Sequence, residues 1–466
     1  MNRRSEPTSK HSVAEGERAM TDPRGPLLSR RQLLKYGGLT AVAVGAAGLG
    51  PRLVGSVLQP ARAAAADRPP DLMLVGTDGW ISLPPSPSIF SQSLGVTVHP
   101  DSYAPDGRTT YIFGFANASG LADDVQFNLK NKAQHSAPLF WAREGQDFRV
   151  QLTNVGLAQR PDLFDEHTVH WHGFKNVIPF FDGEPTGSIS IPQGQTFTYV
   201  YNSHDPGTYM YHCHVEDTEH VHMGMTGLVF VRPAQDGNTS LYPSGKYAYN
   251  DGDGSTGFDR EFAMFLSEVW ADSHWADAHI QLPEWSDYRA DFSLLNGRVY
   301  PDTLQPHGSI AQDDTFVVQR DGSWDLLAPA GRPDLANQPL SALVTCNAGE
   351  RVLLRFANLG FLEAAMTLAG IKLHVVGRDA TLLRGRTGFD TGYETNTISF
   401  GAGESFDAIF TAPAHSGGSG PDTYVLYNRA YARGDNLAGG GGQRTEVHVY
   451  PAGALPAQRF PNDLRL

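Results

Sequence analysis

The feature that most constrains the fold is a strand-and-turn pattern that occurs twice along the chain. Nine positions separate Gly145 from Asn154 in the first copy, and nine positions separate Gly349 from Asn358 in the second. A pattern that recurs with the same internal spacing indicates one structural unit used twice. We therefore predict two copies of a single domain type.

Each copy consists of short runs in which apolar and polar residues alternate, as in residues 147–154 and 196–201. The runs are separated by turns, in keeping with a total of 50 Gly and 31 Pro. Alternation with a period of two, at short and regular spacing, is typical of a β-sandwich. The sequence thus predicts an all-β protein with two sandwich domains.

The domain boundaries follow from changes in composition. Residues 64–240 are predicted to form the first domain, which holds the metal-ligand candidates, and residues 255–452 the second, which lacks them. The stretch 234–258 is rich in Gly, Asp, Asn and Ser and is the expected linker between the two domains.

Residues 1–63 are predicted to be a twin-arginine signal peptide. The segment Ser29–Lys35 contains the paired arginines, a weakly apolar run follows at 37–50, and Ala61-Arg62-Ala63 offers a cleavage site. Glycines and a proline interrupt the apolar run, so the segment is expected to be removed and no membrane span to remain after processing. The product is expected outside the cytoplasmic membrane, either periplasmic or extracellular.

The charge of the protein restricts its partners. The leader carries ten basic and four acidic residues, so its removal would change the net charge from −14 to −20. Such a surface disfavours nucleic acid and anionic membranes as partners and favours cationic small molecules or metal ions.

Two short stretches contain most of the candidate metal ligands, HTVHWHGF at 167–174 and YHCHVEDTEHVHMGM at 211–225. The chain has only two cysteines, and Cys213 stands between two histidines, which favours a metal-bound thiolate. Cys346 is then left as an unpaired buried residue. A disulfide between the two cysteines is the alternative, as expected for an exported protein.

Strand parity separates these candidate ligands into two centres. Side chains an even number of residues apart lie on the same face of a strand, and those an odd number apart lie on opposite faces. One centre is therefore predicted to contain His167 and Cys213. The other, behind it, is predicted from the remaining histidines of the two strands, namely His170, His172, His212 and His214.

The loop after the cysteine supplies two further ligands for the first centre, His220 and Met225. Two imidazoles and a thiolate with a weak thioether are the donor set of an electron-transfer copper site, and zinc is the main rival metal. His222, alternatively a solvent-facing loop residue, competes with His220, and Met223 competes with Met225. The four imidazoles of the second centre suit copper that binds O₂ or nitrite.

The motif His167-x-x-His170-x-His172-Gly173, together with His212-Cys213-His214…His220…Met225, resembles the paired signature of the multicopper oxidases, in particular their two-domain, laccase-like branch. The resemblance implies two cupredoxin-like Greek-key domains. It also implies type 1 copper at His167, Cys213, His220 and Met225, and type 2 or type 3 copper at His170, His172, His212 and His214. A phenol, an aromatic amine or a metal ion would donate single electrons, and O₂ would be reduced between domains, often in a trimer.

The second domain departs from the pattern of that family. When the two copies of the repeat are aligned, Thr367 takes the position of His170 and Tyr427 takes the position of His212. Neither side chain replaces an imidazole on copper. His374 or His135 is the nearest candidate to complete a smaller site, as in the similar copper nitrite reductases. A copper oxidoreductase with O₂ as acceptor is the leading hypothesis. A non-catalytic copper carrier and a nitrite-reductase-like enzyme are the alternatives.

Overall fold

The computed structural model describes residues 68–464 apart from 308–310, 313–316, 319–327 and 438. Pro70–Leu466 form one compact unit, distinct from residues 1–69. The predicted signal peptide lies outside the described residues. Among those residues, no helix has the length and apolar character needed to cross a membrane.

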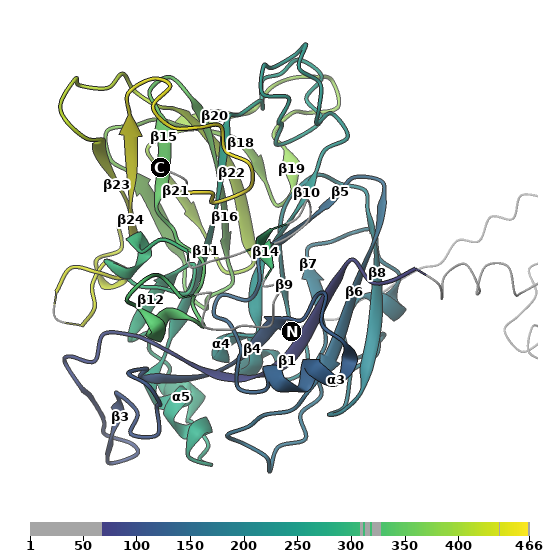
Figure 1. Ribbon diagram of the computed structural model, residues 1–466, viewed down its shortest axis with the longest axis vertical. Helices are drawn as coiled ribbons and strands as arrows, with labels where there is room; N and C mark the ends of the chain where they lie inside the picture. Colours follow the sequence, from purple (N-terminus) through teal and green to yellow (C-terminus); the bar gives the residue numbers. More distant parts are fainter. Residues whose placement is uncertain (1–67, 308–310, 313–316, 319–327, 438, 465–466) are drawn as a thin grey trace, which may run out of the picture. The chain divides into compact units, whose positions relative to one another are not determined.

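The first sandwich consists of two four-stranded sheets, drawn from purple to teal in Figure 1. One sheet has the order β4-β1-β6-β8, with bounds Thr110–Asn117, Leu72–Ile81, Gln146–Asn154 and Thr196–Ser203. The other has the order β5-β10-β9-β7, with bounds Phe140–Arg143, Thr226–Arg232, Gly207–His212 and His170–His172.

The second sandwich repeats this arrangement and is drawn from green to yellow. Its larger sheet has the order β12-β11-β16-β22-β18-β19, and β20 also pairs with β18. The bounds are β12 Phe292–Leu295, β11 Arg260–Val269, β16 Arg351–Asn358, β22 Glu404–Thr411, β18 Leu373–Arg378, β19 Thr381–Leu382 and β20 Tyr393–Thr395. The facing sheet has the order β15-β24-β23-β17-β21, with bounds Val344–Asn347, Arg444–Tyr450, Asp422–Asn428, Ala364–Leu368 and Thr397–Phe400.

The remaining elements are short. Two hairpins pair β2 with β3 and β13 with β14, at Ile89–Ser91, Val96–His99, Ala311–Gln312 and Val317–Val318. Within the described residues the α-helices are α3, α4 and α5, at Asp123–Gln126, Asp217–Met223 and Ala271–Ala278. Single 3₁₀ turns occur at Phe127–Leu129, Pro179–Phe181, Trp285–Asp287, Asp302–Leu304, Pro333–Leu335 and Tyr431–Arg433. The predicted all-β fold is confirmed.

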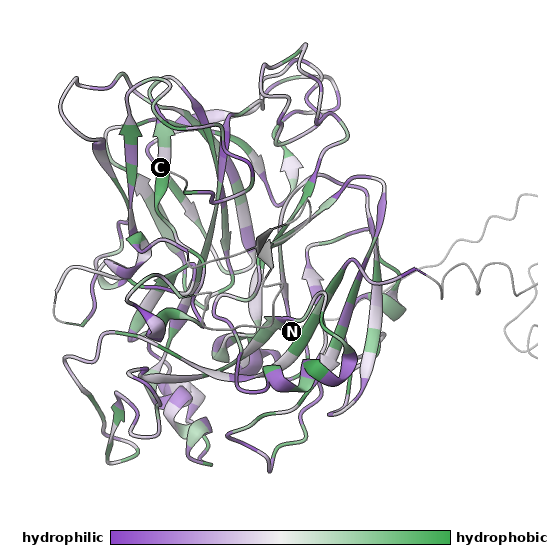
Figure 2. Cartoon of the chain, in the orientation of Figure 1, coloured by the Kyte–Doolittle hydropathy of each residue, from purple (hydrophilic) through white to green (hydrophobic). Residues whose placement is uncertain are grey.

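Each sandwich has its own apolar core, and a third apolar cluster joins them. Apolar residues, green in Figure 2, recur along the strands of both sandwiches. Phe140, Phe148 and Trp171 belong to the first core, and Phe356 and Phe406 to the second. The cluster between the sandwiches is made of side chains from both, among them Trp141, Met210, Leu228, Phe230, Phe265 and Ala357. Strands β9, β10 and β11 are consequently buried along their whole length.

The repeat seen in the sequence is present at the level of single hydrogen bonds. Asn154 ends β6, and its side-chain oxygen accepts a hydrogen bond of 2.9 Å from the backbone N–H of Gly156. Asn358 ends β16, and its side chain accepts an equivalent bond of 3.1 Å from Gly360. The backbone carbonyls of the two asparagines also accept from Gly194 and Gly403 respectively. The two copies therefore share one turn chemistry.

The expected linker at 234–258 is an ordered, packed segment. Ala248, Tyr249 and Phe258 are buried in an apolar cluster with Leu353 and Ile409 of the second sandwich. The hydroxyl of Tyr249 donates a 2.5 Å hydrogen bond to the buried carboxylate of Asp407. A few apolar and aromatic side chains within the segment expected to link the domains fix it to the second sandwich.

Candidate metal centres

Three of the candidate ligands lie on two adjacent strands of the first sandwich, His170 and His172 on β7 and His212 at the end of β9. The two strands pair antiparallel, with His170 opposite His212 and His172 opposite Met210. Directly opposed side chains lie on the same face of a sheet, so His170 and His212 are neighbours, and Cys213 turns to the other side. Figure 1 shows the two strands side by side in the first sandwich.

The first centre contains His167, Cys213 and His220. Their potential ligand atoms all lie within 4.8 Å of one another, and all three side chains are fully buried. The Cys213 sulfur lies 3.3 Å from Nδ1 of His220. Met225 is also buried. Its backbone carbonyl accepts a 3.1 Å hydrogen bond from the N–H of Cys213, and its own N–H donates a 2.9 Å hydrogen bond to the backbone carbonyl of His220. The structure thus brings together the ligand atoms of three of the four residues that the sequence predicted for this centre, and it places the backbone of Met225 next to two of them.

The segment between Cys213 and Met225, expected to be a loop, contains helix α4. Glu216 has a left-handed φ of 46° just before the helix, and Gly224 follows it with a φ of 121°. The helix directs His220 toward Cys213. His222, two residues further along, lies on a different side, where its Nε2 accepts a 3.1 Å bond from Trp270 N–H. His222 is buried, so the alternative of a solvent-facing residue was wrong.

Charge and hydrogen bonding favour a thiolate at Cys213. Burial would raise the pKa of its thiol, but the charge of His220, its contact with the sulfur and the nearby imidazole of His167 hold this pKa well below its ordinary value. Burial likewise opposes the charged form of His220, yet Cys213 and Asp165 raise its pKa to about 10. The backbone N–H of Thr168 points at the sulfur from 3.4 Å. The thiolate is the form of cysteine that binds metals.

The ring of His167 fits against a glycine. A Cβ added to Gly76 on β1 would lie 2.7 Å from Cδ2 of His167, closer than real Cβ contacts allow. Neither ring nitrogen of His167 has a hydrogen-bond partner within geometric limits, although both are buried. A buried imidazole without partners is costly, and coordination of a metal would satisfy it.

The second centre contains His170, His172, His212 and His214. Potential ligand atoms of His170, His172 and His212 lie within 4.8 Å of one another. The ring of His214 lies 5.0 Å from that of His170 and 5.4 Å from that of His212, measured between centroids. The structure thus brings the four predicted histidines into one cluster, on the opposite side of the strand pair from the Cys213 sulfur.

Backbone carbonyls orient two of these rings. Nδ1 of His170 donates to the carbonyl oxygen of Asp182 at 2.7 Å, and Nδ1 of His212 donates to that of Cys213 at 2.7 Å. Fixing Nδ1 in this way leaves Nε2 free for a metal, and Nε2 of His212 is buried without a partner. Burial lowers the pKa of His170 and His172, and it lowers that of His212 to about 3. The rings are therefore held in the neutral form that ligates metals.

The second sandwich offers no imidazole at the equivalent positions. In that sandwich Thr367 lies opposite Tyr427, in the place of the pair formed by His170 and His212. The second sandwich instead approaches the cluster with its backbone at Gly403. A Cβ added to Gly403 would lie 2.9 Å from Nε2 of His172. The register deduced from the repeat is correct at this pair.

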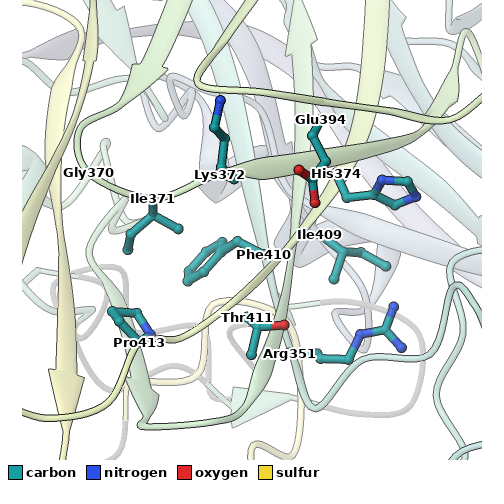
Figure 3. A pocket seen from close by; sticks show the side chains of 10 residues that line it. All are labelled: Arg351, Gly370, Ile371, Lys372, His374, Glu394, Ile409, Phe410, Thr411 and Pro413. Carbon is teal, nitrogen blue, oxygen red and sulfur yellow. The ribbon is translucent and has the colours of Figure 1, made fainter.

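The two histidines suggested as replacements lie elsewhere. Figure 3 shows His374 on β18 among the residues that line a pocket of about 380 Å³ on the second sandwich, with Lys372 and Glu394. His135 is buried between the sandwiches, 3.2 Å from the hydroxyl of Ser267. Neither belongs to the cluster, so the suggestion that either completes it was wrong.

The second cysteine belongs to none of the potential ligand groups found among the described residues. Cys346 is buried and free, and so is Cys213, which excludes the disulfide between them. Burial raises the pKa of the Cys346 thiol to about 12. It is therefore an inert core residue, as predicted.

Three contributors to these centres were missed in the sequence. Asp165 lies 3.7 Å from Nε2 of His220, and Glu216 lies 4.0 Å from the same atom. Asp182 is the third contributor, because its backbone carbonyl orients the ring of His170. Asp165 precedes His167 by two positions, so strand parity predicts that the two side chains lie on the same face. The position of Glu216 could not be predicted without knowing that residues 217–223 form a helix.

Copper fits these donors better than zinc does. A thiolate and two imidazoles beside a methionine suit copper, and the unpartnered buried nitrogens of His167 and His212 need a ligand that no side chain supplies. Fold and sites thus define a copper-binding β-sandwich protein.

Comparison with known proteins agrees with this class. A family model described as multicopper oxidase matches residues 124–236, the part of the chain that contains both ligand motifs. Laccase-3 of Thanatephorus cucumeris is 22% identical over 343 residues, covering 68% of this chain and 50% of that protein. The multicopper oxidase MmcO of Mycobacterium tuberculosis is 37% identical over 78 residues, 17% of this chain and 14% of that protein. The chain spans half or less of the length of these curated relatives.

Solved structures share the fold. The blue copper oxidase from Nitrosomonas europaea has a TM-score of 0.52 at 20% identity, covering 81% of this chain and 85% of that one. The multicopper oxidase mgLAC also has a TM-score of 0.52 at 20% identity, with 83% and 87% covered. Residues 124–236 thus match the multicopper oxidase family model, and the fold resembles that of solved multicopper oxidases.

Proposed function

We propose that this protein is an exported copper-dependent oxidoreductase. His167, Cys213, His220 and Met225 would hold a type 1 copper, which would accept single electrons from a donor. His170, His172, His212 and His214 would hold a second copper centre, which would take these electrons on to O₂ as the acceptor. The observation that carries the proposal is the placement of Cys213, whose sulfur belongs to one cluster while the residues on either side of it belong to the other.

The side chains of the chain prepare both centres. Copper, when bound, supplies a one-electron redox couple at each of them. The N–H of Thr168 donates to the Cys213 sulfur and holds it in place. The hydroxyl of Thr168 accepts a 2.8 Å hydrogen bond from the N–H of His214. Thr168 therefore ties the thiolate side of the strand pair to the histidine side. Burial of Cys213 excludes water from the sulfur.

A second candidate function is a copper protein without turnover, in which the four histidines hold metal only. The observation in its favour is the pairing of Thr367 with Tyr427, which removes imidazoles from the second sandwich. A nitrite-reductase-like enzyme with a single type 2 copper is a further alternative within the same geometry.

Copper stoichiometry combined with electron paramagnetic resonance distinguishes these functions. For an electron relay we expect two coppers per chain, both with a paramagnetic resonance signal and one with an intense blue thiolate absorption band. Turnover with O₂ or with nitrite as the acceptor then distinguishes an oxidase from a nitrite reductase. A single blue copper would support the non-catalytic protein. Four coppers, two of them silent, would restore full oxidase chemistry and contradict our interpretation of the second sandwich. The absence of a blue band would reject the type 1 site.

A further inference from the structure

The pocket of about 380 Å³ on the second sandwich contains side chains of both charges, and its volume lies in the range of sites for small molecules. His374 of β18 pairs opposite Ile409 of β22 and opposite Glu394 of β20, so these three side chains form a row on one face of the larger sheet. Figure 3 shows the row together with Lys372, which precedes β18. All the residues that line the pocket belong to the second sandwich.

The floor of the pocket is apolar and closely packed. Ile371, Ile409 and Phe410 line it, and they are 6%, 3% and 2% exposed. The ring of His374 lies against the backbone of Gly392, where an added Cβ would be 3.1 Å from its Cε1. Side chains that are packed in this way keep their positions, so the floor offers a fixed contact to a small apolar group.

Two opposite charges line the pocket without a partner. Within the part of the chain that the structure describes, neither the ammonium of Lys372 nor the carboxylate of Glu394 forms a hydrogen bond or an ion pair, with each other or with another residue. The guanidinium of Arg351 is already engaged, because it donates to the backbone carbonyls of Gly254 and Ser255. One positive and one negative charge are therefore left for a ligand.

A ligand with a single charge does not suit this pair of side chains. An anion would be attracted by Lys372 and repelled by Glu394, and a cation would meet the reverse. A zwitterion can place its carboxylate at Lys372 and its ammonium at Glu394, so that both contacts are favourable. The apolar floor then remains for the uncharged part of the same molecule.

We propose that this pocket binds a free α-amino acid with a small apolar side chain. Lys372 holds the carboxylate, Glu394 holds the ammonium, and the floor contacts the side chain. The site is separate from the electron transfer proposed above and does not depend on bound copper. Because both charged side chains are exposed, water and salt weaken their contacts, and we expect a dissociation constant on the order of 1 mM.

The test is a saturation-transfer NMR titration of the copper-loaded protein with L-valine at low ionic strength. The copper is kept reduced with ascorbate in the absence of O₂, because amino acids bind Cu(II). Isovalerate, which lacks the ammonium, and isobutylamine, which lacks the carboxylate, are the matched ligands. The variants are Lys372→Met and Glu394→Gln. Lys175→Met and Glu363→Gln are the controls, because both residues are exposed and lie outside this pocket.

We expect the native chain and both controls to bind L-valine alike, and each pocket variant to bind it at least about threefold more weakly. Isovalerate and isobutylamine should bind the native chain at least about threefold more weakly than L-valine does. Tighter binding of L-valine by Glu394→Gln would indicate a simple anion site, and tighter binding by Lys372→Met a simple cation site. Either of these results, an unchanged affinity in both pocket variants, or the absence of saturable binding would overturn the proposal.

Discussion

His212 donates a hydrogen bond from Nδ1 to the carbonyl oxygen of Cys213, 2.7 Å away, so each of these neighbours fixes the other. The bond turns Nε2 of His212 toward His170 and His172, while the sulfur of Cys213 faces His220 on the opposite side. One peptide unit therefore separates the two candidate copper centres. A short covalent connection of this kind is the feature on which an electron relay depends.

Replacement of Cys213 by serine should abolish the blue band and any turnover. A hydroxyl is a much weaker ligand than a thiolate for this redox couple. The measurement is the visible absorption spectrum of the copper-loaded protein, with far-ultraviolet circular dichroism to verify the fold. Cys346→Ser is the control and should leave the spectrum intact, because Cys346 is buried in the second core. Turnover that survives in Cys213→Ser would contradict the relay.

Gly76→Ala should perturb the first centre through the ring of His167. The added Cβ would lie 2.7 Å from Cδ2, so either the ring or strand β1 must move, at a cost of about 1–3 kcal/mol. We expect a weakened or shifted blue band and a lower midpoint of unfolding in urea.

Gly385→Ala is the matched control for this change. Its added Cβ would meet nothing closer than the carbonyl oxygen of Phe389, at 3.9 Å. An unchanged spectrum in Gly76→Ala would show that His167 does not require the space left by the glycine.

The sequence alone was sufficient to predict the two faces of the ligand strands. Strand parity is a geometric rule that needs no tertiary contact, and it separated Cys213 correctly from His212. The repeat also gave the correct pairing of Thr367 with Tyr427, because both copies keep the same turn between their strands.

Positions that depend on tertiary packing could not be predicted in the same way. The seven residues 217–223 form a helix because that segment packs between the sandwiches, and α4 contacts both β4 and β11. This packing decides that His220 joins the centre and that His222 lies against Trp270. Such a choice depends on residues distant in the sequence, so spacing within the motif could not resolve it.

Buried histidines outside the metal centres should make the metal-free protein sensitive to acid. Burial lowers the pKa of His274 to about 3 and that of His135 to about 4, from an ordinary value of 6.5. Because these pKa values are lower in the folded state, the neutral rings stabilise the fold above about pH 6.5, and this stability is lost as the pH falls toward the folded values. Each histidine should cost about 2 kcal/mol between pH 7 and pH 5.

The contribution of one histidine can be isolated with His274→Asn. In the native chain Nδ1 of His274 donates to the carbonyl of Tyr111 at 2.6 Å, and an asparagine amide can donate in its place. Urea unfolding at pH 7 and at pH 5 should show that the loss of stability is smaller by about 2 kcal/mol in the variant. Equal losses in the two proteins would mean that His274 is not held neutral by burial.

Arg355→Leu should destabilise the junction of the sandwiches strongly. Arg355 is fully buried and pairs with Glu261 at 3.0 Å and with Asp407 at 3.3 Å. Asp407 in turn accepts a 2.6 Å bond from Thr208 on β9, the strand that ends with His212. Removing the guanidinium leaves the buried carboxylate of Asp407 without this cation, whereas Glu261 retains Arg232. We expect a cost of about 3–5 kcal/mol in the free energy of unfolding.

The matched control for this junction is Arg378→Leu. Arg378 has 49% of its side chain exposed and pairs with Glu404 near the surface, so its loss should cost less than about 1 kcal/mol. Urea unfolding measures both costs, and copper content after dialysis reports on the centre. We expect copper to be lost from Arg355→Leu and retained in Arg378→Leu, since β9 carries His212 and is fixed to the second sandwich through Thr208 and Asp407. Similar costs in the two variants would show that the buried pairs contribute no more than a surface pair does.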